Sequence, residues 1–310
     1  MKKNILFAMA LISLMAISSF AVNPREMTFP PLKFEPPEPV RFIIDNGIIV
    51  YFLEDHQLPV ITTAALFKGG TVYDQSSKIG LTELTATLLR TGGAGNRNPE
   101  QIDQDLDFVG AVINSASSND YLMLDLRTLK KDADLGFEML ADMLQMPLFD
   151  TSKISLEISN RKDEIRRQND DPGTITRRIY YQTTYAGHPY GNFATLTSMD
   201  AIKRDDIIAH YKKFYAPNNC ILAISGDLTL NEAEEFVGKY FGSWEKSNLT
   251  LDSIPAATMR YKPGVYYGNK DINQANIRLG HLCIDDKNPD RYALDIVNFA
   301  LGGGGALPRA

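Results

Sequence analysis

The side chains in this sequence that could do chemistry are few, and histidine is the scarcest of them. The chain has 310 residues and only four histidines. They are His56, His188, His210 and His281. Zinc hydrolases often hold their metal with two histidines one helical turn apart, so that both imidazoles reach one ion. No such pair exists here, and we expect each histidine to be a surface or packing residue.

Carboxylates are the other group with suggestive spacing. Glu157 and Glu164 are seven residues apart in a predicted long helix, so two helical turns place them on one face. Together with Glu83 they would offer three carboxylates, a set that suits calcium or magnesium better than zinc. The alternative is that both are solvated charges on a surface helix, where Glu157 can pair with Arg161.

Composition and motifs exclude several function classes. Apolar residues make up 44% of the chain, charged residues 23%, and the formal net charge is −6. These values are ordinary for a globular protein, and the absence of a basic stripe argues against a nucleic-acid partner. The sequence has no Gly-x-Ser-x-Gly nucleophile turn and no phosphate-binding loop. Cys220 and Cys283 lie in apolar, strand-like runs, so we expect two buried free thiols and no disulfide.

The first 21 residues have the pattern of a secretory signal peptide. Two lysines precede an almost wholly apolar stretch from Ile5 to Ala16, and Ala21 provides a small residue for cleavage. The alternatives are a buried N-terminal helix or an uncleaved anchor. We predict an exported protein, periplasmic or secreted, with no membrane span once the signal is removed.

The elements that must position these side chains follow from periodicity and turn residues. A hairpin is predicted around Asn46-Gly47, followed by strands and helices in mixed order. The predicted strands are 42–44, 48–52, 60–67, 111–117, 121–129 and 219–225. The predicted helices are 80–90, 98–108, 133–146, 151–169, 174–184, 204–214 and 231–241. We expect Thr151 or Ser152 to cap the long helix.

A second, incomplete unit is predicted near the C-terminus. Strands at 265–267 and 276–284, then a helix at 290–301, repeat the order of residues 48–93. The predicted organisation is therefore a signal peptide and a lead-in, a first domain, a linker and the start of a second, homologous domain. Its parts are signal peptide 1–21, Pro-rich lead-in 22–40, N-terminal domain 41–245, linker 246–263 and truncated second domain 264–310.

Three stretches together resemble the insulinase/pitrilysin family of zinc peptidases. The first runs from Gly69 to Asp74 and on through Gly80 to Thr87, and the second is Pro147-Leu148-Phe149-Asp150 with the helix after it. The third and most specific runs from His188-Pro189-Tyr190-Gly191 to Gly226-Asp227. Members of this family carry H-x-x-E-H on a helix. The resemblance implies an α+β fold of repeated halves, each a mostly antiparallel sheet with helices packed on one face.

The resemblance also shows what this chain has lost. The two histidine positions of the motif fall on Glu83 and Thr87, and the catalytic glutamate falls on Ala86. The third zinc ligand corresponds to Glu164, since 76 residues separate it from Thr87, and Glu157 matches a second family glutamate near the site. A neutral hydroxyl is a poor zinc ligand and an alanine cannot accept a proton. We therefore expect no catalytic residues and no metal, and zinc only if the inactive interpretation is wrong.

The function implied by this resemblance is that of a non-catalytic partner subunit. In this family, members without the zinc motif accompany active subunits, as in mitochondrial processing peptidase. The expected partners are a zinc-containing sibling and a peptide or unfolded protein substrate. Two alternatives stay open: an active metal-dependent endopeptidase with an atypical carboxylate site, and a stand-alone peptide-binding module.

Overall fold

The computed structural model describes residues 28, 33 and 35–303. The predicted signal peptide and most of the Pro-rich lead-in therefore lie outside the described residues. Within the described part of the chain, residues 39–303 belong to one compact unit. In the part that the structure describes, every helix is too short or too polar to cross a bilayer.

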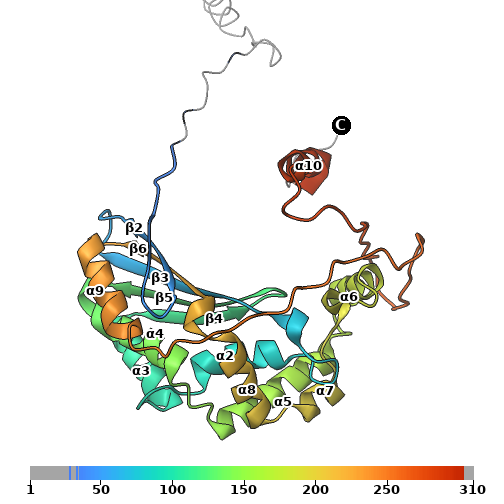
Figure 1. Cartoon of the computed structure of the whole chain (residues 1–310). Coiled ribbons are helices and arrows are strands. Elements are labelled where there is room, and N and C mark those ends of the chain that lie inside the picture. The colour runs from blue at the N-terminus through green and yellow to red at the C-terminus, as the bar shows by residue number, and fades with distance from the viewer. Residues whose placement is uncertain (1–27, 29–32, 34, 304–310) are drawn as a thin grey trace, which may run out of the picture. The chain divides into compact units, whose positions relative to one another are not determined.

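A six-stranded sheet is the centre of the fold, with the strand order β1-β2-β6-β3-β5-β4 (Figure 1). Neighbouring strands are antiparallel, except that β2 and β6 are parallel. The strands are β1 (Val40–Ile43), β2 (Ile49–Glu54), β3 (Val60–Lys68), β4 (Val112–Ser117), β5 (Tyr121–Leu129) and β6 (Cys220–Gly226). The sheet is thus mostly antiparallel, as predicted.

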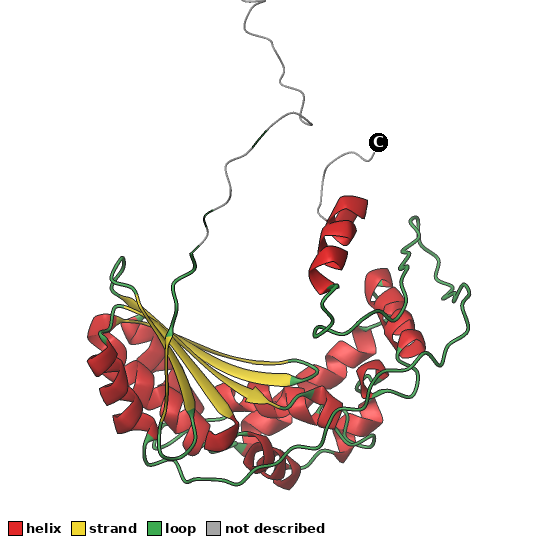
Figure 2. Cartoon of the chain, turned by 45° about the horizontal axis from the view of Figure 1, so that its top comes forward, coloured by secondary structure: helices red, strands yellow, loops and turns green. Residues whose placement is uncertain are grey.

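One face of the sheet is buried under the helices (Figure 2). Alternation along the strands explains this, because successive side chains point to opposite faces. In β3, the side chains of Ile61, Thr63, Ala65 and Phe67 are buried, while those between them are exposed or half-buried. The β5 strand repeats the pattern with three buried leucines. The result is an α+β domain with helices packed on one face, which confirms the predicted fold class.

The helix layer follows the predicted order. In chain order, the helices of the described residues are α2 (Leu81–Thr91), α3 (Pro99–Val109), α4 (Ala133–Gln145), α5 (Thr151–Arg167), α6 (Pro172–Thr184), α7 (Leu196–Ala201), α8 (Arg204–Phe214), α9 (Leu230–Phe241) and α10 (Arg291–Asn298). Short 3-10 turns are η1 (Thr71–Tyr73), η2 (Lys130–Asp132), η3 (Pro189–Gly191) and η4 (Pro217–Asn219), and α10 runs into a π-helical turn, Phe299–Gly303.

Two details of the helices differ from the prediction. The side chain of Asp150 caps α5 by accepting hydrogen bonds from the backbone N–H groups of Ser152 and Lys153. Asp150, one residue before the predicted caps, is the better cap because one carboxylate accepts from both N–H groups and its negative charge is favoured at a helix N-terminus. The short helix α7 was not predicted, although Thr195 and Ser198 form a capping box at its start.

The predicted strands at 265–267 and 276–284 are wrong for this structure, in which both segments are irregular. A strand needs a neighbouring strand for its backbone hydrogen bonds. None lies beside these segments within residues 35–303, and apolar side chains such as Val265 and Leu279 stay exposed. Cys283 is consequently exposed, against the prediction of a buried thiol, whereas Cys220 is buried in β6. Burial raises the pKa of the Cys220 thiol far above its ordinary value.

Candidate functional site

The start of helix α2 is held by the carboxylate of Asp74. This carboxylate accepts hydrogen bonds from the backbone N–H of Gly80 at 2.9 Å and of Thr82 at 3.1 Å, and from the Thr82 hydroxyl at 2.6 Å. Gly80 has a φ of 103°, a left-handed conformation that glycine adopts without strain. A negative charge at a helix N-terminus is also favoured by the helix dipole. The segment 74–82 therefore fixes the helix that carries the degenerate motif.

A buried polar chain extends from Asp74 through Thr82 to His210 of α8. Thr82 Oγ1 lies 2.9 Å from His210 Nε2. A hydroxyl has one proton, and the contact with Asp74 is the shorter one, so Thr82 donates to Asp74 and His210 Nε2–H donates to Thr82. The imidazole is then neutral, with its proton on Nε2. Its Nδ1 atom is buried and has no partner within the described residues.

The two ends of this Asp74–Thr82–His210 chain have opposite pKa shifts, both caused first by burial. Burial raises the pKa of Asp74 to about 6, although the hydrogen bonds from Thr82 and Gly80 oppose the rise. Burial lowers the pKa of His210 to about 4, and Lys213 contributes a smaller part. At neutral pH the chain therefore holds a carboxylate at the helix start and an uncharged imidazole in the core.

The three degenerate motif positions lie on α2 in different surroundings. Glu83 is exposed and Thr87, one turn later, is half-buried. The Thr87 hydroxyl donates to the backbone carbonyl of Glu83 at 3.0 Å. Ala86 is only 2% exposed and belongs to the buried part of the helix. Position 86 thus offers no group that could accept a proton, and the hydroxyl at 87 is already hydrogen-bonded within the helix.

The two glutamates predicted near the site lie on α5, which packs against α2. The Glu164 side chain is 64% exposed and forms an ion pair with Arg161 at 3.0 Å. The sequence suggested Glu157 as the partner of this arginine, but the observed pair is the i, i+3 pair with Glu164. Glu157 is half-buried. Across the residues that the structure describes, no three His, Cys, Asp or Glu side chains form a group that could hold a metal ion.

A groove lies beside these positions, between α2, α3 and the edge strand β4. Its volume is about 440 Å³ and it is open to solvent. Among its lining residues are Thr87 and Arg90 of α2, Asp103 of α3, and Ile113 and Ser115 of β4. The groove leaves no signal in the sequence, because its walls come from three separate elements.

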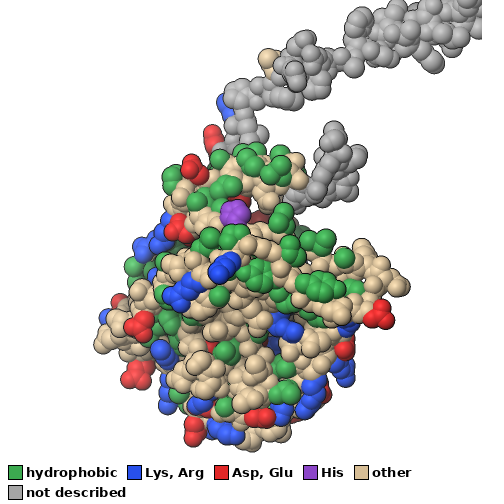
Figure 3. All heavy atoms as spheres, turned by 90° about the vertical axis from the view of Figure 1, so that its right-hand side faces the viewer, with side chains coloured by type: hydrophobic (Ala, Val, Ile, Leu, Met, Phe, Trp, Pro, Cys, Tyr) green, Lys and Arg blue, Asp and Glu red, His purple; other side chains and the backbone are tan. Residues whose placement is uncertain are grey.

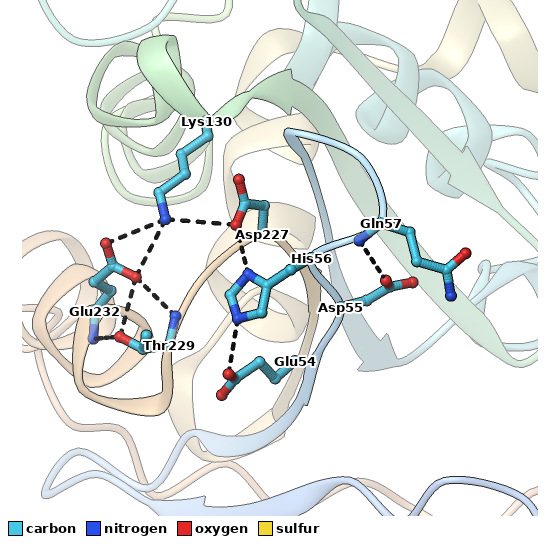
Figure 4. Close-up of polar contacts among 8 residues, drawn as sticks. All are labelled: Glu54, Asp55, His56, Gln57, Lys130, Asp227, Thr229 and Glu232. Carbon is cyan, nitrogen blue, oxygen red and sulfur yellow. Dashed lines mark hydrogen bonds and ion pairs between the residues drawn. The ribbon is translucent and has the colours of Figure 1, made fainter.

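A second polar cluster lies just after the C-terminal ends of the parallel strands β2 and β6 (Figure 4). His56 Nδ1 lies 2.6 Å from Asp227 and its Nε2 lies 2.8 Å from Glu54, while Lys130 connects Asp227 with Glu232. The hydrogen bond with Asp227, followed by that with Glu54, raises the pKa of His56. This cluster ties the loop after β2 to the start of α9, which is a structural role.

The face of the molecule shown in Figure 3 gives no sign of a nucleic-acid interface. On the face shown in Figure 3, acidic and basic side chains are interspersed, with hydrophobic side chains between them. Such a mixture lacks the continuous basic stripe that a phosphate backbone requires.

Comparison with known proteins assigns the fold to a family. A model described as insulinase (peptidase family M16) matches residues 50–197, and one described as the peptidase M16 inactive domain matches residues 201–308. The chain belongs to the insulinase family. A solved structure of a peptidase M16 inactive domain from Pseudomonas fluorescens superposes with a TM-score of 0.74 and 22% identity, over 87% of this chain and 65% of that one.

Three relatives with similar sequences have names that describe different functions. An uncharacterized zinc protease of Streptomyces coelicolor is 26% identical, over 68% of this chain and 48% of its own length. Subunit 1 of the bovine mitochondrial cytochrome b-c1 complex is 22% identical over 85% of this chain and 56% of its own length. A non-peptidase homolog of Helicobacter pylori is 23% identical over 82% and 59%. The chain thus spans about half to three-fifths of the length of these relatives.

The residues present do not fit the zinc site that the family implies. A catalytic zinc needs three protein ligands and an open position for water. The positions on α2 supply an exposed carboxylate, a hydroxyl already bonded to the backbone and a buried methyl group. Glu164, which the resemblance assigns to the remaining ligand position, is paired with Arg161. This donor set has neither the imidazoles nor the proton acceptor of a zinc peptidase.

Proposed function

We propose that this chain is a non-catalytic subunit of an exported peptidase, which binds extended peptide for a zinc-containing sibling. The observation that carries the proposal is the state of α2. The carboxylate of Asp74 caps this helix and so fixes where it starts. At the positions where a zinc peptidase needs two imidazoles and a general base, the helix carries Glu83, Ala86 and Thr87.

The edge strand β4 supports the peptide-binding part of the proposal. Among the residues that the structure describes, β4 pairs with β5 on one side and with no strand on the other, which leaves a free edge. An exposed edge strand is a template for an added strand, whose main chain supplies affinity without demanding one sequence. The edge runs beside α2 and borders the groove. A peptide on β4 would therefore lie next to the positions that bind zinc in active members.

The partner-subunit part is supported by the relatives. One of them is named as a subunit of a complex and another as a non-peptidase homolog. The predicted signal peptide supports an exported location, periplasmic or secreted. A stable pair with a sibling should bury at least about 1,000 Å² of surface.

Co-purification tests the proposal. The full-length protein, tagged at its C-terminus, is isolated from its native cell, and zinc is measured in the recovered complex. We expect a relative that retains H-x-x-E-H and about one zinc per pair. Recovery of monomer or homodimer only, with a sibling that cleaves equally well alone, would refute the partner role and leave the stand-alone peptide-binding module. Cation-dependent cleavage by the isolated chain, abolished by Glu164→Ala, would instead favour the carboxylate peptidase.

A further inference from the structure

Arg90, in the last turn of α2, contacts the free edge of β4. Its Nε–H donates to the backbone carbonyl of Ile113 at 2.8 Å. Its Nη1 atom forms an ion pair with Asp103 of α3, also at 2.8 Å. The side chain thus spans from one helix to the edge strand, and a second helix holds the far end of the guanidinium.

The contact with Ile113 identifies which backbone groups of β4 face the free edge. In an antiparallel pair, the N–H and C=O of one residue point to the same side, and neighbouring residues point to opposite sides. Since the Ile113 carbonyl meets Arg90, it points away from β5. The same side then carries the N–H and C=O groups of Ser115 and Ser117. These are the groups that an added strand would pair with, and Arg90 occupies one of them.

The guanidinium donates to the same carbonyl oxygen that an incoming backbone N–H would use. A peptide strand added to β4 would place an N–H opposite the Ile113 carbonyl, at ordinary hydrogen-bond distance. The Arg90 Nε–H already donates to this oxygen. The oxygen has a second lone pair, but an added strand would have to approach it past the arginine side chain, so peptide and arginine compete for access to one acceptor.

The contacts that hold the Arg90 guanidinium are weak enough for a ligand to displace it. The Arg90 side chain is 23% exposed, but Asp103 is 57% exposed. An ion pair with one partner so accessible to water is weak and is screened by salt. Moreover, Asp103 is the only carboxylate with which Arg90 forms an ion pair among the residues described, so one exposed ion pair holds the guanidinium against the Ile113 carbonyl.

We infer that Arg90 is a displaceable strap on the edge of β4, and that an extended peptide must move its guanidinium off the Ile113 carbonyl to pair with the whole strand. The inference rests on the proposed peptide-binding function and adds a regulatory step to it. Proline at the residue opposite Ile113 would prevent pairing, because it has no N–H to replace that of Arg90.

Peptide binding to strap variants tests the inference. The probe is a dye-labelled, proline-free peptide of about six to eight residues, a common strand length. A copy with N-methylated backbone amides controls for main-chain pairing. Arg90→Met keeps the aliphatic stem and removes the donors, and Asp103→Asn loosens the guanidinium. Arg177→Ala removes an exposed arginine of α6 and is the matched control.

We expect Arg90→Met to bind the probe about tenfold more tightly than the wild type, the worth of one hydrogen bond to a charged group. Asp103→Asn should give a smaller gain and Arg177→Ala none. Raising the salt concentration should tighten binding by the wild type but not by Arg90→Met. In the NMR spectrum, the Arg90 Nε–H should exchange slowly with solvent, and saturating probe should remove this protection.

Each contrary result has a distinct meaning. Equal or weaker binding by folded Arg90→Met would overturn the strap and leave the proposed function intact. So would an Arg90 Nε–H that exchanges as fast as that of Arg177 in the absence of probe. If neither the wild type nor any variant binds the probe, Arg90→Met included, the proposed peptide-binding function is refuted, and the inference about Arg90 is refuted with it.

Discussion

Replacement of Thr82 by valine removes one oxygen atom from the buried polar chain at the start of α2 and keeps the shape of the side chain. Thr82 is fully buried, and its hydroxyl contacts Asp74, His210 and the carbonyl of Gly70. Losing the bond to the Asp74 carboxylate costs about 1.5–3 kcal/mol. The His210 Nε2–H is left buried without an acceptor, which costs about 1–3 kcal/mol. The added methyl group returns about 0.8 kcal/mol, so we expect a net loss of about 3 kcal/mol in the free energy of unfolding.

The same substitution should change the pH dependence of stability. Asp74 has a folded pKa of about 6, above the ordinary value of 3.8 for this side chain. A raised carboxyl pKa means that its contribution to stability is complete below the unfolded pKa and is lost as pH rises through the folded one. Valine removes the hydrogen bond that lowers this pKa, so the pKa rises further and the loss at neutral pH grows. Urea unfolding should therefore show a larger difference between variant and wild type at pH 7.5 than at pH 5.

Thr85→Val is the matched control on the same helix. Thr85 is also fully buried, but its hydroxyl donates only to the Leu81 carbonyl at 2.8 Å, within the helix. We expect a cost of at most about 1 kcal/mol and no pH dependence. A Thr82→Val loss no larger than that of Thr85→Val, or one that does not change with pH, would refute the assignment of Thr82 as donor to a charged Asp74.

The other predictions concern the motif, one glycine and one histidine. Restoring Glu83→His, Ala86→Glu and Thr87→His together should create a zinc site with Glu164, measured by metal titration; a folded triple mutant without tight zinc would mean that the register is wrong or that Glu164 does not face position 83. Gly70→Ala should prevent folding or destabilise it strongly, as judged by circular dichroism, because Gly70 has a φ of 113° and a Cβ there would lie 2.4 Å from the backbone of Asn119; a stable variant would contradict this. The pKa of His56 is raised, so the stabilisation by its ion pairs is complete below the unfolded pKa and is lost as pH rises through the folded pKa. The difference in unfolding free energy between wild type and His56→Gln should therefore shrink between neutral and alkaline pH. A difference that grows would show that the charged imidazole is not the stabilising form.

The sequence was sufficient to predict most of the sheet and helix layer between residues 42 and 241. The reason is local: alternating apolar residues in β3 and β5 and cap residues such as Asn98 before α3 act within a few positions of the element they specify. The same reasoning failed at 265–267 and 276–284. Apolar, β-branched residues indicate that a segment can be a strand, but only a neighbouring strand makes it one.

The sequence could not reveal the contacts that define the site. Thr82 and His210 are 128 residues apart, and Arg90 meets Ile113 only because the edge strand passes the end of α2. Such contacts depend on tertiary packing, which leaves no periodic signal in either segment. The family pattern placed Glu83, Ala86 and Thr87 on α2, but it could not say that position 86 is buried or that Glu164 would take Arg161 as its partner.

The place of β6 in the sheet has a consequence for the order of folding. β6 lies between β2 and β3, pairing parallel with the first and antiparallel with the second, although it follows them by more than 150 residues. Until residue 226 has been synthesised, β2 and β3 must stay apart with two unpaired inner edges. At about 5–20 residues per second, synthesis of the intervening chain takes several seconds or longer. Such long-range pairing makes closure of the sheet a late and slow step. A nascent chain that cannot close its sheet early keeps these strand edges exposed until translation has passed residue 226, which is the period in which edge-to-edge association threatens it most.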